Sequence, residues 1–553
     1  MSKATQSATI ALFCFALVAC DGVELTTQNT DSESGSDNTN VNTDANALLN
    51  IGAEVPEDER FGDDYWVLLA QTYPAFVPPP EIGAAHDASE NINLGRWGDV
   101  IEWPQIASGA ANLPDGRVVT WSSTQDDGFG GQTAFTHGSI FDPVTETFTD
   151  SPNNNHNTFC AGISMLADGS IFTAGGGDRG NVATTSIFTN DSWSLTNPMN
   201  QERWYPQSTT LPSGQVVTSL GTKDTAFSEI WTQGQGWSTL ANANLQSILD
   251  DNSVKNNLRD WFPALNVAPD GRLFHPGPSS ELFSLDLYTD GAAYTAHGKR
   301  EADDPHRLYN TTVMYDIGKM LIAGGGQPAL NSALTIDING STPIVTATEP
   351  MTFARSMQDS VVLPDGQVLV IGGNSSGIQF SDEGTQITPE IWNPDTGQWT
   401  SLAPHSKPRN YHTTSVLLKD GRVAAMGGGL CGNCATNQKN GEIFEPPYLF
   451  NPDGTRAVQP QITGGTAEAI AGDTLSLTAT SGMQSFAMLR LVAITHHHST
   501  DQRYVPLTFT ETQAGSYSIQ LPANRNVLVP GYYWVFALDA NGVPSVGLSL
   551  IHI

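Results

Sequence analysis

The chain has 553 residues, and its 57 acidic residues outnumber its 24 basic residues to leave a formal charge of −33. This acidic excess argues against nucleic acid or an anionic membrane surface as a partner. The length exceeds one ordinary hydrophobic core, so we expect a large repeat architecture or several domains. With 53 glycines, 33 prolines and 15% charged residues, the composition favours an all-β protein of short strands and tight turns.

The first 20 residues are predicted to be a signal peptide. Lys3 precedes an apolar run, Ile10 to Ala19, that is too short for a permanent membrane helix. The run ends in L-V-A-C, which resembles the lipobox of bacterial lipoproteins and marks Cys20 for lipidation. We therefore expect an exported protein, anchored to a membrane (periplasmic or cell-surface) through that lipid alone. An ordinary signal peptide, giving a secreted protein, is the alternative.

Two segments without repeats follow the signal. Residues 21–59 consist mainly of Asn, Thr, Ser, Asp and Glu, and such a stretch cannot bury enough apolar surface to fold. We predict a disordered tether there. Residues 60–95 include a Tyr-Trp pair and three consecutive prolines, and we predict a lead-in segment that packs against the next domain.

Residues 96–457 carry a repeat in which an apolar strand, a glycine turn and a second strand recur. The copies include L-P-D-G-R-V and L-K-D-G-R-V, and several end in two or three glycines. The seven turn glycines are spaced 45 to 57 residues apart and are Gly116, Gly169, Gly214, Gly271, Gly318, Gly366 and Gly421. This pattern is typical of a kelch-type β-propeller, so we predict seven blades around a central channel.

Residues 458–553 lack the repeat and alternate as short strands, which predicts a C-terminal immunoglobulin-like β-sandwich. The predicted strands are Thr474–Thr478, Ala487–Ile494, Val505–Thr510, Tyr517–Leu521 and Tyr532–Leu538.

Cysteine usage separates two kinds of site. Cys431 and Cys434 form a C-x-x-C pair, and in an exported chain a disulfide is the default. A zinc half-site would need a second ligand pair, and the sequence has no other cysteine pair. Cys160 is left over, as a thiol that is either buried and inert or chemically committed.

Four segments depart from what the repeat needs. Cys160, Tyr205 and the Tyr411-His412 pair each come directly before the first strand of a blade. Equivalent points of different blades converge at one end of a propeller channel, so these side chains are expected to meet. The fourth segment, Ile494 to Arg503 in the predicted sandwich, holds three consecutive histidines.

These segments resemble the galactose oxidase and glyoxal oxidase family of copper radical oxidases. With the lipobox, the resemblance implies a bacterial lipoprotein-like member of that family. The resemblance covers about 460 residues and is carried by Y-H-T-T-S-V-L-L-K-D-G-R-V, by T-D-Q-R-Y-V-P-L-T and by P-G-Y-Y-W-V-F-A-L-D. It implies a seven-bladed propeller, and it implies that Cys431 and Cys434 form the family's disulfide.

The resemblance also implies one Cu(II) per chain, bound by Tyr205, Tyr411, His412 and His496. It implies a thioether that joins Cys160 to Tyr205 as a radical cofactor, with Tyr411 as the axial tyrosine. The pattern T-H-x-x-x-T-D-Q-R selects His496 and leaves His497 and His498 without a role.

Elementary chemistry agrees with this assignment. Two imidazoles with oxygen donors suit Cu(II). Oxidising an alcohol by O2 moves two electrons, and one copper accepts one of them, so a tyrosyl radical at Tyr205 can hold the second. Tyr411 can take the hydroxyl proton as the base. A histidine from the C-terminal domain implies a loop that threads the propeller channel.

Two features of the family are missing from their usual places. The tryptophan that shields the radical is absent from Ser219–Lys223, which leaves Trp204 and Trp261 as candidates. The segment Asn257–Phe262 does not align with the substrate-binding arginine. The substrate is therefore left open among galactose, glyoxal and other primary alcohols or aldehydes.

We predict a monomeric oxidase that converts a primary alcohol or hydrated aldehyde, with O2, to the aldehyde or acid and H2O2. One alternative is a catalytically silent propeller that binds glycans or proteins. Another is a copper protein without the cross-link.

Overall fold

The computed structural model describes residues 87–131, 134–177, 182–221, 226–249, 261–287 and 293–552. These residues fall within one compact unit, Gly52–Ile553. The predicted signal peptide, tether and most of the lead-in lie outside the described residues. No helix within the described ranges is apolar and long enough to cross a membrane.

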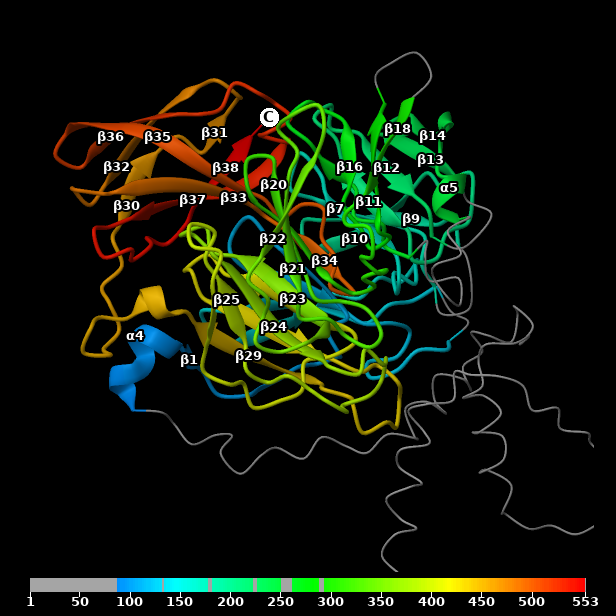
Figure 1. The fold of residues 1–553 in the computed structure, drawn as a ribbon, viewed down its shortest axis with the longest axis horizontal. Coiled ribbons are helices and arrows are strands. Elements are labelled where there is room, and N and C mark those ends of the chain that lie inside the picture. Colours follow the sequence, from blue (N-terminus) through cyan, green and yellow to red (C-terminus); the bar gives the residue numbers. More distant parts are fainter. Residues whose placement is uncertain are drawn as a thin grey trace, which may run out of the picture. The chain divides into compact units, whose positions relative to one another are not determined.

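The seven predicted blades are present as seven separate antiparallel sheets (Figure 1). Blades 2 to 6 each take four consecutive strands. Their bounds are β7 (Gly162–Met165), β8 (Ile171–Ala174), β9 (Thr185–Thr189) and β10 (Ser192–Thr196); β11 (Gln207–Thr210), β12 (Val216–Ser219), β13 (Phe227–Thr232) and β14 (Gly236–Asn244); β15 (Asn266–Val267), β16 (Leu273–His275), β17 (Glu281–Asp286) and β18 (Ala293–Lys299); β19 (Thr311–Asp316), β20 (Lys319–Ala323), β21 (Ala333–Asp337) and β22 (Ile344–Thr348); β23 (Ser356–Val362), β24 (Val368–Asn374), β25 (Glu390–Trp392) and β26 (Trp399–Ser401).

Blades 1 and 7 borrow strands from distant parts of the chain. Blade 1 holds β3 (Gly109–Asn112), β4 (Val118–Trp121), β5 (Gly138–Asp142) and β6 (Thr147–Asp150), and β34 (Ala493–Thr495) pairs with the inner edge of β3. Blade 7 holds β27 (Thr413–Leu417), β28 (Val423–Gly427) and β29 (Asn440–Glu445), and β1 (Arg96–Trp97) and β2 (Ile101–Glu102) pair with β29. The propeller is thus closed by β1, from the start of the described chain, which pairs with β29 of the last blade.

The repeated glycines are needed for the backbone conformation of the turns. All seven turn glycines have positive φ, between 64° and 103°, which residues with a side chain rarely adopt. Inner strands such as β3, β7, β11 and β27 are buried at every residue, and the outer strands β6 and β10 are mostly exposed. The burial gradient follows from stacking blades around one axis.

The C-terminal strands form one sheet in the order β30-β32-β36-β35-β33-β37-β38-β31. Their bounds are β30 (Ile462–Gly465), β31 (Glu468–Ala469), β32 (Thr474–Ala479), β33 (Ser485–Arg490), β35 (Tyr504–Gln513), β36 (Ser516–Gln520), β37 (Gly531–Leu538) and β38 (Leu548–His552). Strand β35 pairs with β33 through Leu507 and with β36 from Thr508 onward, and both halves share one core. This arrangement is the sandwich-like unit predicted for the C-terminal residues.

The prediction of a single strand over Ala487–Ile494 is wrong. The chain leaves the C-terminal sheet after Arg490, and Ala493–Thr495 continues as β34 in blade 1. Alternation alone could not reveal this switch, because both halves are buried and apolar. Short helices complete the described elements: η1 (Ala88–Glu90), α4 (Asn91–Leu94), α5 (Gln246–Leu249) and η3 (Pro447–Leu449).

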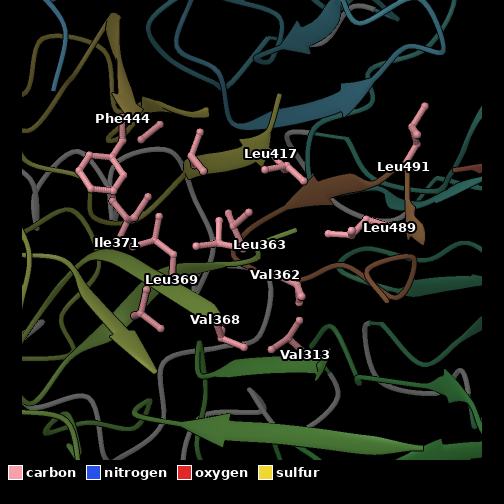
Figure 2. Close-up of a cluster of buried hydrophobic side chains, with 14 of the residues drawn as sticks. Val313, Val362, Leu363, Val368, Leu369, Ile371, Leu417, Phe444, Leu489 and Leu491 are labelled. Carbon is pink, nitrogen blue, oxygen red and sulfur yellow. The ribbon is translucent and has the colours of Figure 1, made fainter. Parts of the chain in front are cut away.

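A shared hydrophobic core joins the C-terminal sheet to the propeller. Leu489 and Leu491 belong to the same buried cluster as Val362 and Leu417 of blades 6 and 7 (Figure 2). This cluster supports the segment that runs on from Leu491 into the propeller.

Candidate functional site

The predicted site residues start from equivalent places in different blades. Cys160, Tyr205 and His412 directly precede or flank the starts of β7, β11 and β27, and their φ values are 59°, 61° and 66°. This left-handed backbone costs roughly 1–3 kcal/mol at each such residue. Inter-blade bonds help hold it, since the Tyr205 amide donates to the Cys160 carbonyl at 3.0 Å. The bends let blades 2, 3 and 7 present side chains to one point, which a regular pleat would not allow.

Two tyrosines form the centre of the site. The hydroxyl oxygens of Tyr205 and Tyr411 lie 2.7 Å apart, and both rings are buried. The hydroxyl of Tyr309, at the start of blade 5, donates to Tyr411 at 3.3 Å. Gln379 donates in turn to Tyr309 at 2.6 Å. Sequence reasoning missed Tyr309, which lies 102 residues from its partner in the chain.

The backbone sets the tautomer of His412. Its Nδ1 lies 2.6 Å from the Gly429 carbonyl, which can only accept, so Nδ1 carries the proton. Its Nε2 is left with a lone pair and has no hydrogen-bond partner in the described part of the chain. The ring stacks on Tyr411 with centroids 3.8 Å apart. His412 therefore presents a buried, unprotonated nitrogen to the site.

A hydroxyl sets the tautomer of His496 in the same way. Thr495 gives its hydroxyl proton to the Ser108 carbonyl at 3.0 Å, so its oxygen accepts from His496 Nδ1 at 2.7 Å. The Nε2 of His496 then carries the lone pair. The rings of His412 and His496 have centroids 4.5 Å apart. Hydrogen bonds of this kind on the outer ring nitrogen are the usual support of a metal-ligating histidine.

The leftover thiol belongs to the same cluster. Cys160 is 1% exposed, and its sulfur lies 3.5 Å from His496 Nε2. The Cys160 and Tyr205 side chains pack in one buried cluster. The sequence left this thiol as either buried and inert or chemically committed, and the structure shows that it is buried beside His496.

The aromatic groups around Tyr205 differ in orientation. Trp261 lies parallel to the Tyr205 ring, with centroids 4.1 Å apart and an angle of 4° between the planes. Trp204 meets the same ring edge-on, at 4.4 Å and 76°. Trp261 is therefore the residue that covers the phenol face. It precedes blade 4, so its contact crosses between blades.

Burial disfavours a charged side chain of either sign at this point. Burial raises the pKa of Tyr205 and Tyr411 well above the usual value for a phenol. Burial also lowers the pKa of His412 to about 3 and that of His496 well below its usual value. Both effects arise because a charged side chain loses its hydration here. A phenolate in this site needs a neighbouring cation, and both histidines stay neutral, as ligands must be.

The donors that converge here are two imidazole nitrogens and two phenol oxygens. Such a nitrogen and oxygen set suits Cu(II). No group of three His, Cys, Asp or Glu able to hold a metal occurs within the described ranges, so a metal at this site must draw on the tyrosines. The Nε2 of His412 forms no hydrogen bond within the described residues, so its lone pair can serve a metal.

The C-x-x-C pair forms a disulfide, as predicted, between Cys431 and Cys434. Cys431 packs in one cluster with Tyr309, Phe380 and Tyr411. The disulfide therefore supports the wall of the site next to Tyr411.

Several phenylalanines pack around the histidines and Tyr411. Phe159 packs against the rings of His412 and His496, and Phe380 packs edge-on against Tyr411. Phe129 is half-buried and contacts both Phe159 and Phe380. The segment expected to carry a substrate arginine lies mostly outside the described residues.

The chain is similar to known proteins along most of its length. Residues 459–552 match the family model "Galactose oxidase-like, Early set domain", and residues 317–440 match "Glyoxal oxidase N-terminus". The chain is 35% identical over 483 residues to a galactose oxidase of Gibberella zeae, covering 83% of this chain and 70% of that protein.

Two further comparisons extend this likeness. An aldehyde oxidase of Arabidopsis thaliana is 27% identical over 448 residues, which is 70% of each chain. The solved structure of a fungal alcohol oxidase of the AA5 family in complex with copper superposes with a TM-score of 0.78 at 30% identity. The superposition covers 83% of this chain and 100% of that one.

Proposed function

This chain belongs to the galactose oxidase and glyoxal oxidase family of copper radical oxidases, and we propose that it oxidises a primary alcohol or hydrated aldehyde with O2, releasing H2O2. The proposed products are the aldehyde or the acid. The proposed ligands of one Cu(II) are Tyr205, Tyr411, His412 and His496. The observation that carries the proposal is the convergence of these four donors beside the Cys160 thiol.

Bound copper would accept one electron of each two-electron oxidation and acidify a coordinated hydroxyl. The chain supplies the rest of the chemistry. Tyr411 takes the hydroxyl proton, and its hydrogen bond from Tyr309 holds the phenol in place. Tyr205 holds the second oxidising equivalent as a phenoxyl radical. Its face is covered by Trp261, which keeps water from the ring.

The proposed cofactor is a thioether between Cys160 and Tyr205. Its formation joins the sulfur to the ring carbon beside the phenol oxygen, with loss of the thiol hydrogen and one ring hydrogen. O2 accepts the two electrons and two protons and becomes H2O2. The packing of Cys160 and Tyr205 in one buried cluster supports this bond. A sulfur substituent lowers the potential at which the phenol is oxidised.

The phenylalanines favour an apolar substrate. Phe159 and Phe380 cover the histidines and Tyr411, and half-buried Phe129 joins them. A sugar would leave hydroxyl groups unpaired against these rings, at a cost of about 1–3 kcal/mol for each buried group. We propose an aromatic or aliphatic primary alcohol, or its aldehyde, in preference to galactose.

The rival function is a propeller that binds glycans or proteins without catalysis. Such a module has no use for four buried tyrosine and histidine side chains that meet at one point. The convergence of the two tyrosine hydroxyls with the rings of His412 and His496 counts against the rival most directly. The third possibility is a copper protein without the cross-link. It differs from the proposed enzyme only in lacking the bond between Cys160 and Tyr205, and mass spectrometry of the copper-loaded chain can detect that bond.

Export remains a proposal from the sequence. The apolar run and L-V-A-C at Cys20 support a signal peptide and a lipid anchor. The relatives described above are fungal and plant proteins, so a bacterial lipoprotein rests on this motif alone. We propose a monomer that contacts a membrane through the anchor only and binds no nucleic acid.

One experiment tests the enzyme and its substrate together. The purified chain is loaded with Cu(II) in air, and peroxide release is measured with benzyl alcohol, hexanol, glyoxal, methylglyoxal, glycerol and galactose. We expect peroxide, and a higher kcat/KM for the apolar alcohols than for galactose. Peroxide from none of these compounds would refute the oxidase. A preference for galactose would refute the substrate class alone.

A further inference from the structure

Two histidines beside His496 have no role in the copper ligand set. His497 and His498 are 3% and 4% exposed, so their ring nitrogens are largely cut off from solvent. His498 packs its ring against Phe262 at 5.8 Å. His497 lies within the tight turn that carries His496. Its surroundings indicate a specific task.

The three histidines form the tip of an axial hairpin, which we define as residues 493–503. Thr495 and His498 bond to each other through their backbones, at 2.9 and 3.2 Å, and enclose a two-residue turn. The two central residues, His496 and His497, have φ values of 48° and 71°. This is the pattern of a type I′ turn, which favours Asn-Gly and disfavours two residues with large side chains. The tip is therefore strained and needs support from its surroundings.

The limbs of the axial hairpin are held by the blades, but these contacts stop short of the tip. The entering limb is β34, which pairs with blade 1. On the returning limb, Thr500 donates to the Ser208 carbonyl of blade 3 at 2.8 Å. Asp501 accepts from the Met165 amide of blade 2 at 3.0 Å, and Gln502 accepts from the Val362 amide of blade 6 at 2.6 Å.

His497 holds the far side of the tip. Its Nδ1 lies 3.0 Å from Oδ1 of Asp359 in β23 of blade 6, and both side chains have no exposed surface. The His497 ring also packs edge-on against Tyr309 at 5.8 Å, and Tyr309 touches Tyr411. Thr495 holds the near side through its bond to Ser108 of blade 1. The two anchors fix the turn from different blades, with His496 between them.

We propose that His497 and Asp359 form a positioning pair that holds the strained turn so that His496 Nε2 points at the copper site. The inference rests on the proposed function, because His496 needs a defined direction only as a ligand. The pair gives the turn a second anchor, in a different blade from the one that Thr495 contacts. Outer supports of metal ligands typically change metal affinity about 10- to 100-fold when removed.

Cu(II) affinity of the metal-free full chain is the readout, measured under argon by competition with a chromophoric chelator, together with the EPR spectrum of the bound Cu(II). Asp359→Ala removes the carboxyl group that pairs with His497 Nδ1, and we expect affinity to fall about 10- to 100-fold, with a broadened EPR spectrum. Asp359→Asn keeps an oxygen at the Oδ1 position, and we expect it to restore affinity to within about threefold of the unaltered chain.

His497→Gly separates the anchor from the turn conformation. Glycine suits the left-handed position, so it relieves the strain while removing the ring that binds Asp359. We expect affinity to fall as in Asp359→Ala. Affinity equal to or above that of the unaltered chain would overturn the proposal, because the turn alone would then be sufficient.

Glu390→Gln provides the matched control. Glu390 lies in the same blade as Asp359 and pairs with Arg355, with both side chains fully buried. We expect a lower melting temperature for this variant but unchanged copper affinity and EPR spectrum. The positioning role would be overturned if Asp359→Ala and Glu390→Gln changed the EPR spectrum in the same way. Absence of copper binding by the unaltered chain would refute the proposed function itself, and equal affinity of all variants would refute the pair alone.

Discussion

Replacing Trp261 by leucine removes the parallel ring over Tyr205 and leaves an apolar side chain in its place. The stack has centroids 4.1 Å apart and planes within 4°, so the full interaction of an aromatic pair is lost. Such pairs contribute about 0.5–1.5 kcal/mol beyond the area they bury. A difference of about 1.4 kcal/mol corresponds to a tenfold change in a rate.

We therefore expect the Tyr205 radical of the oxidised, copper-loaded Trp261→Leu variant to decay up to about tenfold faster than in the unaltered chain. The assay follows the visible absorption of the oxidised protein without substrate. Trp204→Leu is the control, because Trp204 is also buried and contacts Tyr205, but edge-on at 76°. We expect its radical to decay at close to the original rate. Equal acceleration by both variants would show that packing, and not the covered phenol face, protects the radical.

Three other predictions concern the Cys160 thiol, two buried histidines and the disulfide. Cys160→Ala should leave copper bound by the remaining four side chains but abolish the radical absorption, since no thioether can form; full activity in this variant would refute the cross-link. Burial lowers the pKa of His156 to about 4 and that of His275 to about 3, so below pH 6.5 the unfolded chain binds protons that the folded chain excludes. The free energy of unfolding should therefore fall as the pH drops from about 6.5 toward 4. Urea midpoints measured across this range test this, and midpoints that rose at lower pH would contradict it. Replacing both Cys431 and Cys434 by serine opens a loop with a sequence separation of 3. The lost constraint on the unfolded chain should lower the free energy of unfolding by roughly 2 kcal/mol, which denaturant titration measures. An unchanged free energy of unfolding would contradict this expectation.

The propeller could be predicted because its cause is local. Each turn needs a residue with positive φ, so Gly116 and its six counterparts mark every blade in the sequence. The closing strands β1 and β2 escaped notice because two-residue strands carry no periodicity. The switch of strand after Arg490 escaped notice because the partners of β34 lie more than 380 residues away in blade 1.

The site was predictable to the extent that motifs mark it. Cys160, Tyr205, Tyr411, His412 and His496 all stand in recognisable segments, and the structure brings all five together. Their roles as ligands and cofactor remain a proposal. Trp261 could be named only as one of two candidates, because stacking depends on how neighbouring blades face each other. Tyr309 and Asp359 could not be found, since their partners come from other blades or from the axial hairpin.

The bond between Cys160 and Tyr205 is the feature on which the proposed chemistry depends most. Mass spectrometry of proteolysed protein, before and after loading with Cu(II) in air, tests it directly. We expect the peptides that contain Cys160 and Tyr205 to appear as one species, lighter by two hydrogen atoms than their sum, only after loading. The same two peptides remaining separate in fully copper-loaded, folded protein would contradict the account.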